Sequence, residues 1–565
     1  MADERAGTRE PDVRRKYSWL ELLRTFLIAL DPFKLLIAAA GILVTAFGWW
    51  LFSVIYFGMW SEPKGYNDIN PKAREAEIEE RKKALIKDGV EEVAADEKAN
   101  SDYLSDGRRF ELMRGLSGPG GRYRTMPWFQ DRGRNPYLVA TDVVSGSRAD
   151  QSAAVGSVIK QAPVILEPLV KFLGPVYLLF DPNAGFWICA YLFIIIVWML
   201  AVWAFFGGII TRIAAVQFGG KDRISLKQAF RFVANRYLSY LLSPLVPLII
   251  IAVIVFIMSL YGAVALIPIL GDIVLFGIGF PLIILGGIVI AILLIGLVGY
   301  PMMYTTISTE GSDTFDALSR SYNYVFQAPW QYLWYSIVAV VYGAAVTFLV
   351  IVVGCLMVYL GKWAVSQPSS AMATSRKPDF LFVYSPKSLG WQELMLKGSP
   401  AEVEPGYVVD EKANTIRKDY VPSNPQADKA YRDDMTWWNE AGAGMVTFWM
   451  VLVFLLMIGF SYSYFWSAST MIYLLMRKKV DEVELDEVYI EEQPAPALAP
   501  PPPPVSTGPV GSVSLPTVPP PPPPAFTPAT PVPPILPPPA PALSPAEEAP
   551  QPPVPPMIAT APPIV

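Results

Sequence analysis

Histidine is absent from this chain of 565 residues, and cysteine occurs only at Cys189 and Cys355. Without histidine there is no Ser-His-Asp or Cys-His catalytic arrangement and no imidazole to bind a metal ion. Both cysteines lie inside apolar runs, which excludes a disulfide framework or a zinc site. The sequence also contains no glycine-rich motif that would cradle a phosphate. We therefore expect a protein without a cofactor, a metal site or enzymatic activity.

Charged residues are scarce as well. They make up 17% of the chain against 53% apolar residues, whereas about 25% charged residues is usual in a soluble domain. An α-helix needs roughly 20 residues to cross the hydrocarbon of a bilayer. Six blocks longer than this carry no Asp, Glu, Lys or Arg, namely 35–60, 186–210, 245–267, 274–300, 334–360 and 445–475. The sequence predicts an all-α polytopic membrane protein with about six transmembrane helices.

Basic residues in the short segments indicate how these spans are oriented. Arginine and lysine are concentrated in the leader 1–34, in the loop that follows the second span, and directly after the last span. Because positive charge marks the cytoplasmic side of a membrane, we expect a multi-pass protein of the bacterial cell membrane with both termini in the cytoplasm. The leader is expected to hold an interfacial helix over 18–30, ending before Asp31 and Pro32. The long segments 61–162 and 362–442 then face outward.

The first outward segment, 61–162, opens with a charged helix. Asn70 and Pro71 are suited to its first positions and Gly89 to its end, and we favour a solvated helix over a coiled coil. After this helix, arginines are interleaved with aromatic residues. They could bind anionic lipid headgroups or wall polymers, or the stretch could be a plain Gly/Arg loop. No nucleic acid is expected outside the cell. The candidate contacts for an anionic ligand are Arg108, Arg109, Arg122, Arg124, Arg132 and Arg134.

The second outward segment, 362–442, shows strand-like alternation. A strand is expected at 380–384, and a hairpin is expected from 407–409 to 415–416 through a turn at 410–414. Together the two segments could form one small α+β extracytoplasmic cap. After the last span, a charged juxtamembrane segment (477–493) precedes a Pro-rich tail, 494–565. That composition favours an extended, disordered cytoplasmic tail that serves as a spacer or docks partners.

The region 163–361 repeats one unit. The second span leads to Ser225 and Gln228, which form a capping box before a short amphipathic stretch and the third span. The fourth span leads in the same way to Asp313, a second amphipathic stretch and the fifth span. Both stretches are expected to lie in the membrane interface, with aromatic residues at headgroup level, namely Tyr240, Trp330 and Tyr332.

The repeated unit carries a resemblance. The segments GGKDRISLKQAFRF and EGSDTFDALSRSYNYVFQAPWQY resemble loops of bacterial multi-pass families such as the membrane domain attached to glycerophosphodiester phosphodiesterases. The segment MRKKVDEVELDEVYIEE is similar to the ends of uncharacterised bacterial membrane proteins. The resemblance implies a membrane domain without assigned catalysis, and no phosphodiesterase domain is visible in the chain.

The apolar blocks lack ionisable residues, which argues against a proton-coupled carrier or a voltage sensor. Gly277, Gly279 and Pro281 could break the fourth span and offer backbone dipoles to a substrate, although such residues also simply kink packed helices. Gly41, Thr45 and Gly48 allow close packing on the first span, within the chain or between copies, so the oligomeric state stays open.

The leading hypothesis is a non-enzymatic integral membrane scaffold or interaction protein of the bacterial cell envelope. Its expected partners are the lipid bilayer and, through the outward segments and the Pro-rich tail, envelope proteins. The alternative is a permease-like membrane domain that handles a neutral or lipidic substrate.

Overall fold

The computed structural model separates the chain into the units Met1–Glu491 and Glu492–Val565. It describes residues 18–59, 64, 71–116, 125–130, 132–144, 156, 158–159, 161–181, 184–221, 224–267, 269–371, 377–410 and 415–490. All of them belong to the first unit. The Pro-rich tail predicted for 494–565 and residues 1–17 of the leader therefore lie outside the described residues.

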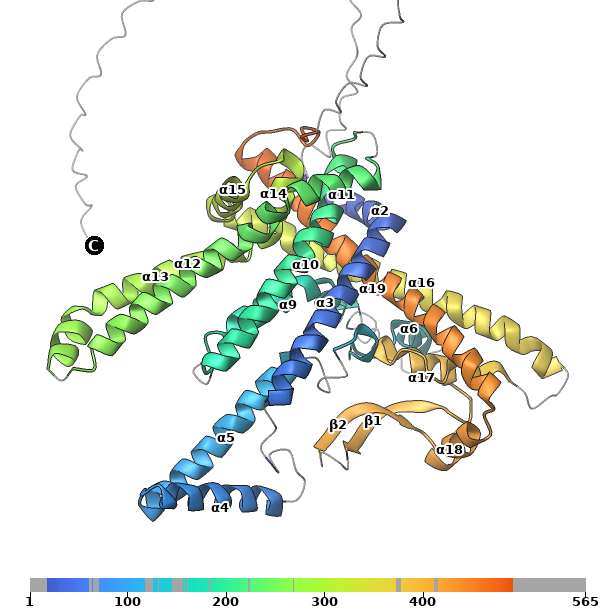
Figure 1. Ribbon diagram of the computed structural model, residues 1–565. Helices are drawn as coiled ribbons and strands as arrows, with labels where there is room; N and C mark the ends of the chain where they lie inside the picture. The colour runs from blue at the N-terminus through green and yellow to red at the C-terminus, as the bar shows by residue number, and fades with distance from the viewer. Residues whose placement is uncertain are drawn as a thin grey trace, which may run out of the picture. The chain divides into compact units, whose positions relative to one another are not determined.

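Within this part of the chain, six helices are long and apolar enough to cross a membrane (Figure 1). They are α3 (Pro32–Met59), α10 (Phe186–Phe218), α12 (Tyr237–Val264), α13 (Phe280–Leu297), α16 (Pro329–Ala371) and α19 (Trp437–Val480). Each overlaps one of the six apolar blocks, which confirms the predicted number of spans. The chain is a multi-pass integral membrane protein.

The repeated unit is present in the structure. After α10, the side chain of Ser225 accepts a hydrogen bond from the backbone N–H of Gln228, and this capping box opens α11 (Leu226–Asn235), which leads into α12. After α14 (Tyr300–Glu310), the side chain of Asp313 caps α15 (Thr314–Gln327), which leads into α16. Both predicted caps are confirmed.

The fourth apolar block is divided differently from the prediction. Its membrane-crossing helix, α13, ends at Leu297, and a separate helix, α14, begins at Tyr300. Pro301 explains the break, because proline lacks a backbone N–H and fits the first turn of a new helix. Most of α14 is fully buried, so this apolar stretch belongs to the core of the bundle.

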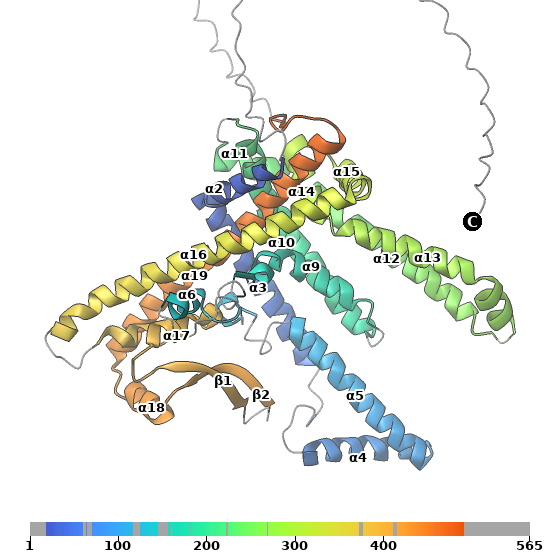
Figure 2. The same cartoon turned by 180° about the vertical axis from the view of Figure 1, so that it is seen from behind.

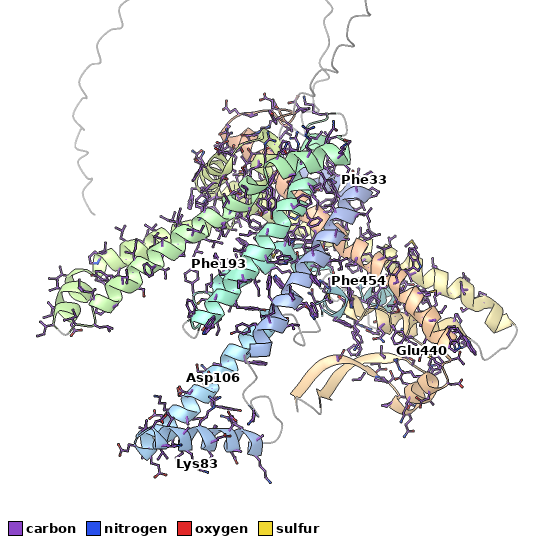
Figure 3. The ribbon with its side chains drawn as sticks, viewed as in Figure 1. Phe33, Lys83, Asp106, Phe193, Glu440 and Phe454 are labelled. Carbon is purple, nitrogen blue, oxygen red and sulfur yellow. The ribbon has the colours of Figure 1, made fainter. Side chains whose placement is uncertain are left out.

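The helix predicted at the start of the first long segment is α4 (Pro71–Lys87), and Gly89 follows it with a φ of +88°. It packs against a second helix, α5 (Glu92–Leu116), as the two adjacent ribbons around Lys83 and Asp106 show (Figure 3). Nη1 of Arg81 lies 2.8 Å from Oδ2 of Asp106 and Nε lies 3.2 Å from Glu77. The predicted solvated helix is thus one half of a salt-bridged helical hairpin.

The second long segment contains the predicted β-hairpin, since β1 (Val403–Asp410) pairs antiparallel with β2 (Thr415–Pro422). The predicted strand at 380–384 is wrong, because a 3-10 helix, η5 (Pro378–Phe382), occupies its place. Pro378 favours a helical first turn, and Asp379 pairs there with Lys362 of α16 at 2.7 Å. The segment also contains η6 (Ser388–Gly390), α17 (Trp391–Leu396) and α18 (Pro425–Asp433).

Both long segments contact each other. The backbone N–H of Lys387 donates to the carbonyl of Trp128 in η3 (Pro127–Phe129) at 3.1 Å. Arg134, just before α6 (Pro136–Val144), lies 4.0 Å from Glu393 of α17. We call the described residues of 125–144 and 377–435 the platform. Its helices α6 and α17 are labelled beside α16 and α19 in Figure 2.

The core of the bundle is built where α3, α10, α14 and α19 meet. Gly41 and Gly48 of α3 lie directly against α10, since a Cβ at Gly41 would lie 3.1 Å from Phe206 and Trp203. The small residues of the first span therefore serve packing within the chain. Tyr240 is fully buried, and its hydroxyl lies 2.8 Å from Oγ of Ser308 near the end of α14. Trp330, in contrast, is 81% exposed.

Candidate functional site

The structure places the six candidate arginines in different surroundings. Arg108 is exposed on α5, and Arg109 lies on the same helix. Arg122 and Arg124 lie outside the described residues. Arg134 belongs to the platform, where its Nη1 lies 3.0 Å from Asp142. Arg132 contacts the helical bundle, and its side chain is 6% exposed.

Arg132 is the centre of a buried ionic cluster. Its Nη2 lies 3.0 Å from Oε1 of Glu167, the first residue of α9 (Glu167–Leu178). The same carboxylate pairs with Lys171 one turn later in α9. Nη1 of Arg132 also donates to the carbonyl of Pro127 at 2.6 Å and to Oγ of Ser388 at 3.0 Å. Arg132 therefore connects η3, η6 and α9.

Lys171 continues this cluster toward the centre of the bundle. Its Nζ lies 3.3 Å from the hydroxyl of Tyr462 on α19. The ammonium also lies 5.8 Å from the ring centroid of Trp49 on α3 and 5.9 Å from that of Tyr462, which are cation–π distances. Lys171 thus joins the cluster to aromatic groups of two membrane-crossing helices.

Neither Glu167 nor Lys171 was singled out from the sequence, because both lie between the first long segment and the second apolar block. A usable signal is nevertheless present, since a Glu and a Lys at i and i+4 interrupt an otherwise apolar stretch, 162–180. Ionisable residues in such a stretch are costly inside a membrane protein and are therefore a reason to suspect a site.

Large aromatic side chains fill the bundle next to the cluster. The ring of Trp203 stacks on Tyr462 at 4.8 Å, and Tyr304 stacks on Trp466 at 5.2 Å between ring centroids. The indole N–H groups of Trp49, Trp203 and Trp466 are buried and have no acceptor among the described residues. The surroundings of the ionic cluster are therefore rich in hydrogen-bond donors.

A second polar cluster lies where α14, α15 and α19 end or begin. The carboxylate of Glu310 accepts from the hydroxyl of Tyr473 at 2.6 Å and pairs with Arg320 at 2.9 Å. Arg477 approaches the same carboxylate at 3.5 Å. Arg212 of α10 donates to the carbonyl of Ser308 at 2.6 Å. These contacts join the ends of four helices.

The segment 481–490, which we call the strap, closes over this second cluster. Arg477 donates to the carbonyls of Glu484 and Glu487 at 3.1 and 2.7 Å. The backbone N–H of Tyr489 donates to the carbonyl of Thr309 at 2.7 Å, so the strap is bound to the end of α14. Val488 is buried against Ala215 and Val216 of α10.

The predicted helix break lies at the end of the α12–α13 hairpin. Gly277 belongs to a π-helical segment, η4 (Leu270–Ile278), and α13 begins after Gly279 with Pro281 in its first turn. The hydroxyl of Tyr261 donates to the carbonyl of Leu275 at 2.5 Å. The carbonyl of Leu275 in η4 is thus used within the hairpin. Among the described residues, none of the contacts of Gly277, Gly279 and Pro281 involves the ionic cluster.

Among the described residues, no group of three or more Cys, Asp or Glu side chains is placed to hold a metal ion. No protein-family model, curated protein or solved structure matches the chain. The resemblance to the membrane domain attached to glycerophosphodiester phosphodiesterases therefore remains a prediction from the sequence.

Proposed function

We propose that the protein is a non-enzymatic scaffold of the bacterial cell envelope that holds a folded platform at the membrane surface. The observation that carries this proposal is the position of Arg132. One guanidinium binds η3 and η6 of the platform and, through Glu167, the bundle helix α9. Both long non-spanning segments are thereby fastened to the membrane-embedded part.

The energetics of a buried ion pair support the proposal that Arg132 holds the platform in a fixed position on the bundle. Removing one partner of a buried ion pair leaves an uncompensated charge and commonly costs about 3–5 kcal/mol. Further contacts support the same arrangement, since Trp391 of the platform is fully buried and packs edge-on against Phe454 of α19 with 6.2 Å between ring centroids. A platform held this way presents fixed surfaces to partners.

In this proposal the platform faces away from the cytoplasm and both termini are cytoplasmic. The basic segments support it, because Lys34 at the start of α3 donates to Gln217 at the end of α10 at 2.9 Å. Arg477 near the end of α19 reaches Glu310 at the end of α14. The basic ends therefore gather on one side, as cytoplasmic ends do. The Pro-rich tail would then offer a second docking segment inside the cell.

Photo-crosslinking in cells tests the scaffold. A crosslinking residue at the exposed Lys429 of α18 should capture a reproducible set of envelope proteins, and Arg132→Gln should abolish that set while the bundle still inserts. The matched control is Arg108→Gln, because Arg108 is exposed on α5. Capture that is unchanged in Arg132→Gln, or no reproducible set from the wild type, would reject the proposal.

The permease-like alternative is favoured by one observation, the interruption of helical structure between η4 and α13. Flux of neutral or lipidic solutes into reconstituted vesicles tests it. A permease should lose flux in Gly279→Leu, because a Cβ at Gly279 would lie 2.1 Å from the hydroxyl of Tyr261. Gly287→Leu is the control, since Gly287 has no atom within 4 Å of its added Cβ. Wild-type vesicles without flux would eliminate this alternative.

A further inference from the structure

The ionic cluster carries a surplus of positive charge. Arg132 and Lys171 are both cations, and Glu167 is the single carboxylate that pairs with either of them among the described residues. All three side chains are largely shielded from solvent, with exposures of 6%, 16% and 12% for Arg132, Lys171 and Glu167. One positive charge is therefore left without a counter-charge.

The same place has unused hydrogen-bond donors. Lys171 packs against the ring of Trp49, and Trp203 stacks on Tyr462, which contacts Lys171. The indole N–H groups of Trp49 and Trp203 are buried and lack an acceptor in the described part of the chain. An indole N–H can only donate. Two donors and a surplus cation call for a group that accepts hydrogen bonds and is negatively charged.

The cluster lies well inside the bundle. Trp49 follows Lys34 by about fifteen residues on α3, which is roughly 22 Å of helix, and Tyr462 precedes Arg477 by the same distance on α19. Water screens charges poorly in such surroundings, so an unmatched charge is costly and its attraction for a counter-ion is strong. The residual exposure of Lys171 provides contact with the surroundings from which an ion could enter.

We propose that the Arg132–Glu167–Lys171 cluster binds a small monovalent anion, such as a halide, beside Lys171. The anion would balance the second cation and accept from the neighbouring indole N–H groups. The anion site uses the same Arg132–Glu167 pair that fastens the platform, but chloride binding can be measured whether or not the platform recruits partners.

The test uses the full-length protein purified in a nonionic detergent. Its unfolding temperature is measured while chloride replaces bulky gluconate at constant ionic strength. A site that binds chloride only in the folded state gives a saturable rise in unfolding temperature, whose concentration dependence yields the dissociation constant. A general salt effect gives no saturation and no preference between the two anions, and that result would overturn the proposal.

Two variants change the local charge in opposite directions. Lys171→Gln removes the surplus cation and should raise the dissociation constant for chloride at least tenfold, which corresponds to about 1.4 kcal/mol. Glu167→Gln removes the competing carboxylate and should lower the dissociation constant. Lys98→Gln on the exposed face of α5 is the matched control and should leave it unchanged.

A purely structural cluster predicts something different. Both variants would then lower stability, and neither would change how stability depends on chloride. If Lys171→Gln fails to fold, Glu167→Gln still decides, because tighter chloride binding supports the site and unchanged binding contradicts it. Bromide located by anomalous scattering within hydrogen-bonding distance of Lys171 would place the ion directly, and bromide found only elsewhere would count against the site.

Discussion

At the scale of single residues, a glycine of the first span lies directly against the second span. A Cβ added at Gly48 of α3 would lie 2.0 Å from Nε1 of Trp198 on α10. That indole N–H donates to the carbonyl of Val44 at 3.3 Å. A side chain at position 48 would therefore displace the indole and break a hydrogen bond between the two helices.

We expect Gly48→Leu to lower the free energy of unfolding by roughly 1–3 kcal/mol, the usual range for overpacking a core. The measurement is thermal unfolding of the purified protein in detergent. Gly287→Leu is the matched control, because it adds the same side chain to α13 where nothing lies within 4 Å of the new Cβ. Equal effects of the two substitutions would show that the α3–α10 contact is not specific.

A second residue-scale prediction concerns pH. Burial raises the pKa of the Glu393 carboxyl on α17, although Arg134 nearby opposes the shift. When folding raises the pKa of a carboxyl, the folded protein loses stability as the pH rises from the unfolded-state pKa through the folded-state pKa. Glu393→Gln should therefore stabilise the platform at pH 7 and have no effect below about pH 4. Unfolding measured at both pH values checks this.

The matched control for this substitution is Glu97→Gln, since Glu97 is exposed on α5 and no interaction there depends on burial. It should change stability little at either pH. A Glu393→Gln variant that is less stable at pH 7 would mean that the ion pair with Arg134, which lies 4.0 Å away, outweighs the cost of burial.

At the scale of elements, the repeated unit explains why two glycines have left-handed backbone. Gly220 after α10 has a φ of +61°, and Gly311 after α14 has a φ of +69°. A Cβ at Gly220 would meet nothing within 4 Å, whereas one at Gly311 would lie 2.9 Å from the ring of Tyr489 in the strap. The two positions share a backbone conformation and differ in one contact.

We expect Gly220→Ala to lower the free energy of unfolding by about 1 kcal/mol, because a residue with a Cβ is disfavoured in left-handed backbone. Gly311→Ala should cost clearly more, since it also pushes Tyr489 away from the end of α14. Comparing the unfolding temperatures of the two variants isolates the strap contact. A further variant, Gly311→Ala with Tyr489→Ala, should recover the difference, and equal costs for both single substitutions would contradict the contact.

The elements predicted correctly are those fixed by neighbours in the sequence. The capping box at Ser225, the cap at Asp313 and the pairing of β1 with β2 depend on residues close together in the sequence. The ionic cluster was not predicted, because Arg132 meets Ser388 across 256 positions. The hydrogen bond between Tyr240 and Ser308 was not predicted for the same reason, since Ser308 lies in the other repeat. Local signals predict elements, and long-range contacts build the site.

At the scale of the whole molecule, contacts between helix ends show which ends lie on the same side of the bundle. Lys34, Gln217, Glu310 and Arg477 lie at helix ends that meet on one side of the bundle. The long segment 377–435 lies between the C-terminal end of α16 and the N-terminal end of α19, which is the end away from Arg477. The six predicted spans could be recognised from composition alone, but which side faces the cytoplasm depends on charge counts that only an experiment in cells tests.

Accessibility of single cysteines to a membrane-impermeant maleimide provides that experiment. Ser101 of α5 and Ser423 before α18 are exposed and suit the outward positions, whereas Ser385 is only 5% exposed and would report burial. Cys355 is buried and should stay silent, and Cys189 is replaced by alanine because it is partly exposed. Ser506 is the reporter for the Pro-rich segment.

If the proposed orientation holds, cysteines at Ser101 and Ser423 label in intact cells, and a cysteine at Ser506 labels only after lysis. The physical reason is that arginine and lysine at the ends of the spans resist transfer across the membrane. The reverse pattern would place the platform and its arginines in the cytoplasm. The scaffold would then present the platform to cytoplasmic partners, while the anion site, which depends on contacts within the folded chain and not on its orientation, would be unaffected.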